Sequence, residues 1–245
     1  MRSYGMATLL IGLDDTDTQA SRGTGYLARC LSAACAERGL RPAGVTRHQF
    51  LVDPRIPYTS HNSGACVAVE ADGGAEAAAF AFDFVAARAA DGSDPGVCIA
   101  AADAVTEAVR AFGAAAAERV VETAEAVALA GEAGLALRPL GGSGLGVIGA
   151  LASVACRAAG RDGRFIDLPG LRDLPERVTL GDIGRLGIRV WPVEAGRRGG
   201  DGDPCRTLGW VRPRLVAHKP VLPVEWSEEH DAWIPVDRKR AKPSA

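Results

Sequence analysis

Lysine is almost absent from this 245-residue chain, which contains only Lys219, Lys239 and Lys242. Between Met1 and His218, therefore, no lysine can bind phosphate, act as a base or form a Schiff base. Arginine, backbone N–H groups or a metal ion must supply any phosphate contact in that region. The formal net charge is −2, so no global basic field attracts nucleic acid, and DNA is not an expected partner.

The sequence also lacks a disulfide framework, a zinc motif and a membrane segment. The six cysteines form no CxxC pair and have no histidine at zinc-ligand spacing, so we expect buried free thiols in a reducing cytoplasm. The first apolar run ends in aspartates rather than at a small-residue cleavage site, which predicts no signal peptide. No apolar run reaches the roughly 20 residues of a membrane helix. A cytoplasmic protein without a membrane partner is expected.

The stretch from Thr8 to Leu31 contains an apolar run, an acidic cluster, a polar turn and the start of a helical pattern. Thr8–Leu13 is predicted to be a buried strand, and Gly25–Arg38 an amphipathic helix that Gly39 ends. A strand, a turn and a helix in this order indicate an α/β fold. Ligands in such folds bind where strands end.

Asp14, Asp15 and Asp17 directly follow the predicted strand. Carboxylates this close raise each other's pKa unless a cation lies between them. Hard oxygen ligands suit Mg²⁺, which proteins usually hold with one or two carboxylates and substrate phosphates. The SRGTG segment that follows can offer N–H groups and hydroxyls to an anion. These features predict nucleotide chemistry, and the alternative is an aspartate-rich turn that caps the helix.

Two more segments are candidates for ligand binding. Asp53–Ala65 is a polar loop between two apolar segments, where His61 can contact phosphate or base, or be an ordinary solvated histidine. Gly141–Gly149 is a glycine-rich turn before a helix, an arrangement that binds anions. No Gly-Lys-Ser/Thr follows it, so it is not a Walker A loop. The alternative is close packing of a helix on a strand at glycine positions.

The rest of the chain alternates short apolar runs with alanine-rich segments, which predicts an α/β fold, or as an alternative α+β, with a mixed sheet and flanking helices. Further strands are predicted at Gly44–Val52, Cys66–Glu70, Val97–Ala101, Leu135–Leu140 and Arg164–Leu168. Further helices are predicted at Ala75–Ala90, Ala102–Phe112, Ala115–Ala130 and Val147–Ala159, with a break near Gly113.

Two regions are predicted, residues 1–190 and residues 191–245. The second begins with a flexible charged linker at Gly196–Pro204 and continues as a proline-rich and tryptophan-rich extension. Frequent prolines are expected to exclude a long helix or a central strand, leaving short edge strands or a small hairpin. The basic tail Asp237–Ala245 is predicted to be disordered. The extension is therefore expected to be β-rich or irregular.

Four segments in the same order resemble the archaeal isoleucine-tRNA agmatinylcytidine synthetase family. The first segment contains GLDDTDT (Gly12–Thr18), a Gly/Thr turn and YLA (Tyr26–Ala28). It resembles the family's GIDDTDS, the turn after it and TYLA. Ile56–Val67 resembles its IPxKTRGNGAV loop, and Asp94–Ala100 resembles its NPG segment. Gly142–Ala155 resembles its GRGLIGALAAIG segment. The resemblance implies that residues 1–190 form the family's kinase-like N-terminal portion.

That family uses ATP and Mg²⁺ to phosphorylate the 2-carbonyl of an anticodon cytosine, after which agmatine displaces the phosphate. By similarity, Asp14, Asp15 and Asp17 would hold Mg²⁺ and the triphosphate, and Thr24 would accept a phosphoryl group. The predicted catalytic residues are Asp14, Asp15 and Thr24. The predicted nucleotide-binding residues are Thr16, Arg22, Gly23, His61, Asn62, Gly142, Ser143 and Gly144. Because lysine is missing, Arg22, Arg47 and Arg138 are further candidates for neutralising phosphate charge.

The sequence departs from the family where cations are expected. The KTRGNG loop is replaced by Thr59–Gly64 and the GRG turn by Gly142–Gly144, so one lysine and two arginines are missing. The family's TTY is Thr24, Gly25 and Tyr26 here. The oligonucleotide-binding domain and zinc ribbon of the family have no counterpart, so this chain is not expected to modify tRNA unaided.

Three functions compete. The first is an ATP- and Mg²⁺-dependent phosphotransferase or ligase that activates a carbonyl-type acceptor, a small molecule or an RNA base, by phosphorylation. The second is a catalytically degenerate nucleotide-binding module that acts with a partner protein or as a homodimer. The third is a haloacid-dehalogenase-type phosphatase. Residues Asp15–Thr18 match the first four positions of that family's DxDx[TV] motif, but Gln19 stands at the fifth. The family also needs a downstream lysine, and no lysine precedes Lys219.

Overall fold

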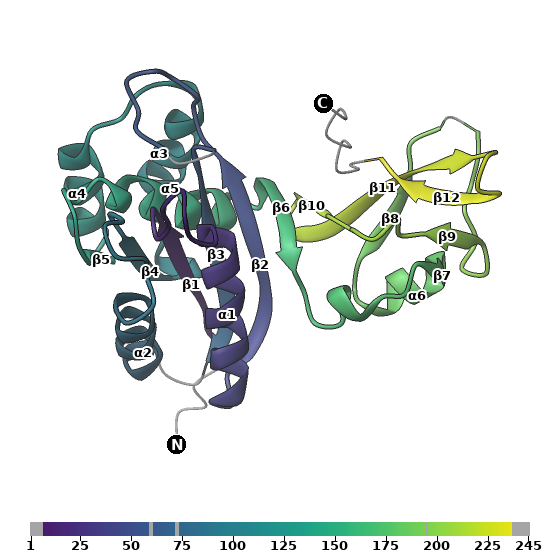
Figure 1. Cartoon of the computed structure of the whole chain (residues 1–245), viewed down its shortest axis with the longest axis horizontal. Coiled ribbons are helices and arrows are strands. Elements are labelled where there is room, and N and C mark those ends of the chain that lie inside the picture. Colours follow the sequence, from purple (N-terminus) through teal and green to yellow (C-terminus); the bar gives the residue numbers. More distant parts are fainter. Residues whose placement is uncertain (1–6, 59–60, 72–73, 195, 237–245) are drawn as a thin grey trace.

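The computed structural model describes residues 7–58, 61–71, 74–194 and 196–236. Among these residues, twelve strands form one mixed sheet in the order β5-β4-β1-β3-β2-β6-β10-β11-β12-β9-β7, and β8 pairs with β11. Figure 1 shows an N-terminal part, with helices around β1 to β5, beside a smaller C-terminal part, with β6 between them. The predicted mixed sheet, flanking helices and β-rich extension are confirmed.

The N-terminal part contains six strands and five α-helices, with a 3₁₀ turn at Ala102–Ala104. Its strands are β1 (Ala7–Asp14), β2 (Arg41–Gln49), β3 (Ser63–Ala71), β4 (Gly96–Ala101), β5 (Ala136–Pro139) and β6 (Arg161–Asp167). Its helices are α1 (Thr24–Glu37), α2 (Gly74–Ala86), α3 (Glu107–Glu118), α4 (Thr123–Glu132) and α5 (Gly146–Ala159).

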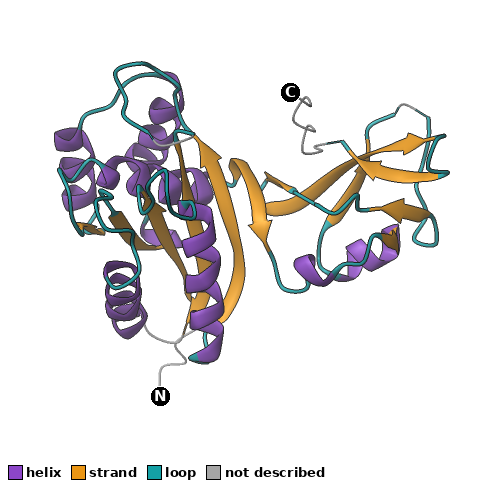
Figure 2. Ribbon diagram, viewed as in Figure 1, coloured by secondary structure: helices purple, strands orange, loops and turns teal. Residues whose placement is uncertain are grey.

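The C-terminal part is mostly strands and loops (Figure 2). It starts with a 3₁₀ turn at Leu171–Asp173 and contains one short helix, α6 (Leu180–Arg185). Its strands are β7 (Arg177–Thr179), β8 (Arg189–Pro192), β9 (Pro204–Arg206), β10 (Arg214–Val216), β11 (Lys219–Ser227) and β12 (Ala232–Pro235).

Strand β1 sends alternate side chains into two apolar cores, as the period of a strand requires. Leu9, Ile11 and Leu13 pack with residues of α1 and α2, whereas Leu10 packs with residues of α3, α4 and α5. Both neighbours of β1, the strands β3 and β4, run antiparallel to it. The carboxyl end of β1 therefore lies beside the starts of β3 and β4, which favours the α+β alternative.

Helix α5 lies unusually close to the sheet because glycines stand on the strands beneath it. A Cβ added to Gly12 of β1, Gly64 of β3 or Gly96 of β4 would collide with atoms of α5. On the helix, a Cβ added to Gly149 would overlap the carboxylate of Asp14. For Gly141–Gly149, the alternative to anion binding is close packing of a helix on strands. That alternative describes the part of the segment from Gly146 onward, which belongs to α5.

The predicted break near Gly113 is wrong, because α3 runs from Glu107 through this residue to Glu118. The break instead lies between α3 and α4. A Cβ on Gly113 would lie 2.7 Å from the Cβ of Ala155 on α5, so this glycine allows two helices to pack closely. The helix also starts later than predicted, where the Thr106 hydroxyl accepts a hydrogen bond from the N–H of Val109.

The expectation that prolines exclude a central strand is also wrong. Strand β11 contains Pro220 and Pro223 and has partners on both sides. Pairing with β10 ends at Val221 and pairing with β12 begins at Val224. On that side of β11, Pro223 falls between these two pairings, and on the other side it is paired with Trp191 of β8.

The C-terminal part has its own apolar cluster, which runs from Phe165 to Trp233. This cluster includes residues on both sides of the predicted boundary at residue 190, whose position stays a prediction. The predicted disordered tail Asp237–Ala245 lies outside the described residues, as do Thr59 and Ser60 of the polar loop.

All six cysteines are free thiols, and all except Cys30 are buried, as predicted. Within the described ranges, no helix combines the length and the apolar composition needed to cross a membrane.

The packing of α3 on α5 predicts opposite effects for two glycine substitutions. Gly113→Ala should lower the free energy of unfolding by about 1–2 kcal/mol, because the new methyl overlaps α5. Gly131→Ala in α4 is the matched control, since a Cβ there meets no atom within 4 Å. The control should raise the free energy of unfolding by about 0.5–1 kcal/mol through helix propensity. Urea denaturation measures both, and equal effects would contradict this account.

Candidate functional site

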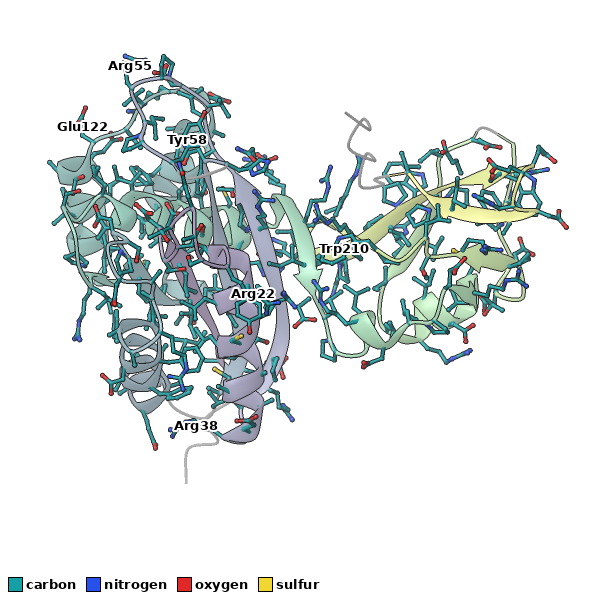
Figure 3. The ribbon with its side chains drawn as sticks, in the orientation of Figure 1. Arg22, Arg38, Arg55, Tyr58, Glu122 and Trp210 are labelled. Carbon is teal, nitrogen blue, oxygen red and sulfur yellow. The ribbon has the colours of Figure 1, made fainter. Side chains whose placement is uncertain are left out.

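A cavity of about 390 Å³ opens where β1 ends. Asp14, Asp15, Asp17 and Thr24 line it together with the first turn of α5. The remaining walls come from the β2–β3 loop and from the connection between α3 and α4. Figure 3 shows Arg55 and Tyr58 of the first loop and Glu122 of the second at the same end of the N-terminal part. We call this the aspartate cavity.

The two aspartates at the strand end resist ionisation. Burial, and then the charge of Asp15, raises the pKa of Asp14 to about 7. Burial, and then the charges of Asp94 and Asp17, raises the pKa of Asp15 to about 6. Asp15 also has a φ of 51°, a left-handed conformation that is uncommon for a residue with a side chain. The turn after β1 therefore brings together carboxylates that a nearby positive charge would stabilise.

Thr24 is held by Asp17 and Thr16. Its hydroxyl donates to Asp17 Oδ1 at 2.8 Å, and it accepts from the N–H and the hydroxyl of Thr16 at 3.2 and 3.1 Å. The N–H of Thr24, at the start of α1, donates to the same Asp17 oxygen at 3.0 Å. Asp17 therefore supplies the helix-capping function of the stated alternative while it also lines the cavity.

Asp94 occupies the N-terminal end of α5. Its carboxylate accepts the N–H of Gly144 at 2.8 Å, the N–H of Leu145 at 3.1 Å and the hydroxyl of Ser143. Although burial opposes the effect, these hydrogen bonds lower the pKa of Asp94. The Ser143 hydroxyl and the Gly144 N–H, both predicted to bind phosphate, thus donate hydrogen bonds to a carboxylate here. The role of this turn in phosphate binding stays a prediction.

A second cavity, of about 270 Å³, adjoins the first, since Asp17, Thr24, His61 and Ser63 line both. Its other walls come from the start of α1, from strands β2, β3 and β6, and from loops of the C-terminal part. The side chains with charged or aromatic groups that line only this cavity are Tyr26, Arg29, Arg47, Arg172, Trp210 and Arg212. We call it the arginine cavity.

The predicted site residues are divided between these two cavities. His61 lines both, Asn62 lines the aspartate cavity, and Gly23 and Arg47 line the arginine cavity. Thr16 lies buried beside Thr24.

Five other predicted residues line neither cavity, namely Arg22, Arg138, Gly142, Ser143 and Gly144. The guanidinium of Arg22 stacks over the ring of Tyr26, and that of Arg138 stacks over the ring of Phe82. The binding roles of all these residues remain predictions.

Several residues in or beside the two cavities were not predicted from the sequence. Asp94 lines neither cavity but binds the turn before α5. It lies in the DPG segment that resembles the family's NPG, and that resemblance was the available signal. The α3–α4 connection and the pair Trp210 and Arg212 form no local motif. They reach the site only through the tertiary fold.

The described part of the chain contains no group of three or more His, Cys, Asp or Glu side chains arranged to hold a metal ion. Asp14, Asp15 and Asp17 line one cavity without converging on one point. One oxygen of Asp17 is engaged by Thr24, which leaves Asp14 and Asp15 as the carboxylates with the strongest need for a cation.

Several solved structures are similar to this chain, among them the following three. One is a tRNA fluorescent labeling enzyme, 28% identical with a TM-score of 0.53 over 60% of this chain and 36% of that one. Another is TiaS, a tRNA agmatidine synthetase, without ligand, 27% identical with a TM-score of 0.52 over 60% of this chain and 35% of that one. The third is TiaS in complex with tRNA and ATP, 28% identical with a TM-score of 0.53 over 61% and 36% of the two chains.

The aligned region spans about 36% of the length of these proteins. No protein-family model matches the sequence, and no curated protein matches it. The solved structures nevertheless confirm the resemblance predicted from four sequence segments. This chain is similar to TiaS over a stretch consistent with an N-terminal portion of that synthetase.

Proposed function

We propose that this protein is an ATP- and Mg²⁺-dependent phosphotransferase or ligase that activates a carbonyl-type acceptor, an RNA base or a small molecule, by phosphorylation. The observation that carries the proposal is that Asp14, Asp15, Asp17 and Thr24 line one cavity with the first turn of α5. The similarity to a TiaS complex that contains tRNA and ATP supports both partners. A cytoplasmic location agrees with such partners and with free thiols.

The donor set at the end of β1 fits Mg²⁺. Asp14 and Asp15 are neighbouring carboxylates whose raised pKa values indicate a cost for carrying two negative charges without a cation. Magnesium held by one or two carboxylates usually completes its shell with water and phosphate oxygens. When bound, the ion would neutralise charge on the triphosphate. Asp14 and Asp15 are therefore the proposed ligands, and Asp17 has a different role.

Asp17 and Thr24 form a base and nucleophile pair in this proposal. The Thr24 hydroxyl already donates to Asp17 Oδ1 at 2.8 Å, within the range for proton transfer to a base. As the Thr24 oxygen bonds to the γ-phosphorus of ATP, its proton passes to Asp17 and the bond to the ADP oxygen breaks. The carbonyl oxygen of the acceptor then bonds to the phosphorus, the bond from phosphorus to the Thr24 oxygen breaks, and Asp17 returns the proton to that oxygen. Thr16 holds the hydroxyl in place through two hydrogen bonds.

A second candidate function is a nucleotide-binding module that has lost catalysis and acts with a partner protein or a second copy of the chain. Two observations favour it. Asp94 takes hydrogen bonds at the α5 N-terminus that a phosphate would otherwise receive. Thr24 is only 6% exposed, which restricts the approach of a phosphoryl donor to its hydroxyl.

Asp15→Asn tests the proposed activity. We expect Mg²⁺-dependent ATP turnover to fall by about 100-fold, because charge stabilisation at the triphosphate is lost. Asp103→Asn, at an exposed position that does not line the aspartate cavity, is the matched control and should keep full turnover. Undiminished turnover in Asp15→Asn would contradict the proposal, and calorimetric ATP binding by the wild type without turnover would favour the degenerate module.

Thr24→Val and Thr24→Ser test the nucleophile. With γ-³²P-labelled ATP, the wild type should acquire protein-bound label that disappears in Thr24→Val, which keeps the side-chain shape but lacks the hydroxyl. Thr24→Ser should retain label because its hydroxyl can still donate to Asp17. Label of equal intensity in Thr24→Val would remove Thr24 from the mechanism.

Asp14→Asn tests the cation requirement through stability. Because folding raises the pKa of Asp14 from 3.8 to about 7, stability should fall as pH rises between these values. Without Mg²⁺ at pH 8, Asp14→Asn should therefore be more stable than the wild type by about 2 kcal/mol, a value reduced for partial exposure.

Urea denaturation between pH 5 and pH 8, with and without Mg²⁺, measures this effect. Millimolar Mg²⁺ should stabilise the wild type at pH 8 and leave Asp14→Asn nearly unchanged. Parallel pH profiles for the two proteins would show that Asp14 is not held in the environment described.

A further inference from the structure

The arginine cavity concentrates positive charge beside Thr24. Four arginines line it, of which Arg29 lies on α1, Arg47 on β2, Arg172 in the turn after β6 and Arg212 before β10. Asp17 is the carboxylate among the lining residues, and Asp167 stands behind Arg172 with a separation of 3.9 Å between Nε and Oδ1. The cavity therefore keeps a positive excess even when both aspartates are counted.

Two of these arginines are held in place by contacts within the chain. Arg47 Nε donates to the hydroxyl of Ser63 at 2.9 Å, and Arg172 donates to the carbonyl of Ile166 at 2.7 Å. Burial lowers the pKa of Arg47, and burial together with the charge of Arg29 lowers the pKa of Arg172. Guanidinium groups fixed in these positions repel one another, and a bound anion would relieve that repulsion.

Trp210 lines the cavity. It lies between the two parts of the molecule (Figure 3). The guanidinium carbons of Arg172 and Arg212 lie 4.3 and 4.7 Å from its ring centre. Its indole Nε1 is buried and has no hydrogen-bond partner among the described residues. Because that nitrogen is enclosed, a ligand in the cavity would meet the ring and the two guanidinium groups that stack on it.

We propose that the arginine cavity binds a phosphate group of the acceptor substrate, with the Trp210 ring holding Arg172 and Arg212 in position. Arginines from several directions suit the tetrahedrally arranged oxygens of a phosphate better than the two coplanar oxygens of a carboxylate. A volume of about 270 Å³ accommodates such a group with part of a sugar or ring. An acceptor with a cationic group in this position would be repelled.

The assignment to the acceptor rests on the proposed function. Thr24 and Asp17 line both cavities, so an acceptor held by its phosphate in one would approach the phosphoryl group carried from the other. The phosphate can belong to a free nucleoside monophosphate or to an RNA backbone, because both present anionic phosphate oxygens to arginine. The aspartate cavity would receive ATP, and the arginine cavity would receive the second substrate.

Titration calorimetry on the full chain tests this site, with inorganic phosphate as the probe and saturating Mg²⁺ and a non-hydrolysable ATP analogue present. Arg172→Gln should weaken phosphate binding about 10-fold or more through loss of a charge. Trp210→Leu removes the aromatic ring on which Arg172 and Arg212 stack, and should weaken binding by a smaller factor of about 3–10. Arg177→Gln, exposed on β7 and outside the cavity, is the matched control and should bind as the wild type does.

Two further titrations identify the source of the phosphate. Uridine 5′-monophosphate binding more tightly than a hexaribonucleotide without terminal phosphates supports a small-molecule acceptor, and the reverse order supports RNA. In either case the affinity should depend on Arg172 and Trp210.

Phosphate binding that is absent, or equal in the wild type and both cavity variants, would overturn the proposal. Competition between phosphate and the ATP analogue would also overturn it, because the cavity would then belong to the nucleotide. If the analogue does not bind but phosphate binds through Arg172 and Trp210, the proposed function fails while the phosphate site stands.

Discussion

Backbone contact between α5 and the sheet is the constraint on which the site depends. Gly12, Gly64 and Gly96 let the helix approach the strands more closely than any side chain would permit. That approach presses Gly149 against the Asp14 carboxylate, removes much of its water and raises its pKa. The helix that closes the core on one face of the sheet thus also creates the demand for a cation at the end of β1.

Features determined by neighbouring residues could be predicted from the sequence. The alternation along β1 and the helical period of α1 are local patterns, and both elements lie close to their predicted bounds. Gly113 and Pro223 were misinterpreted because their roles depend on distant partners. Gly113 accommodates Ala155 of α5, and Pro223 falls at the change of strand partner along β11.

The site shows the same division between local and distant information. Asp14, Asp15, Asp17 and Thr24 are close in sequence, and they line one cavity. The partner of the glycine-rich turn is Asp94, about fifty residues earlier, so no local pattern could indicate that its hydrogen bonds go to a carboxylate. The arginine cavity draws on α1, β2 and the C-terminal part, and only the fold brings these segments together.

Strand β6 forms hydrogen bonds with β2 on one side and β10 on the other, so one continuous sheet joins the two parts. A chain shortened after β6 would present a bare row of N–H and C=O groups along that strand. Such an unprotected edge is a template for self-association. The C-terminal part therefore acts as a cover that keeps the larger sheet from recruiting strands of other molecules.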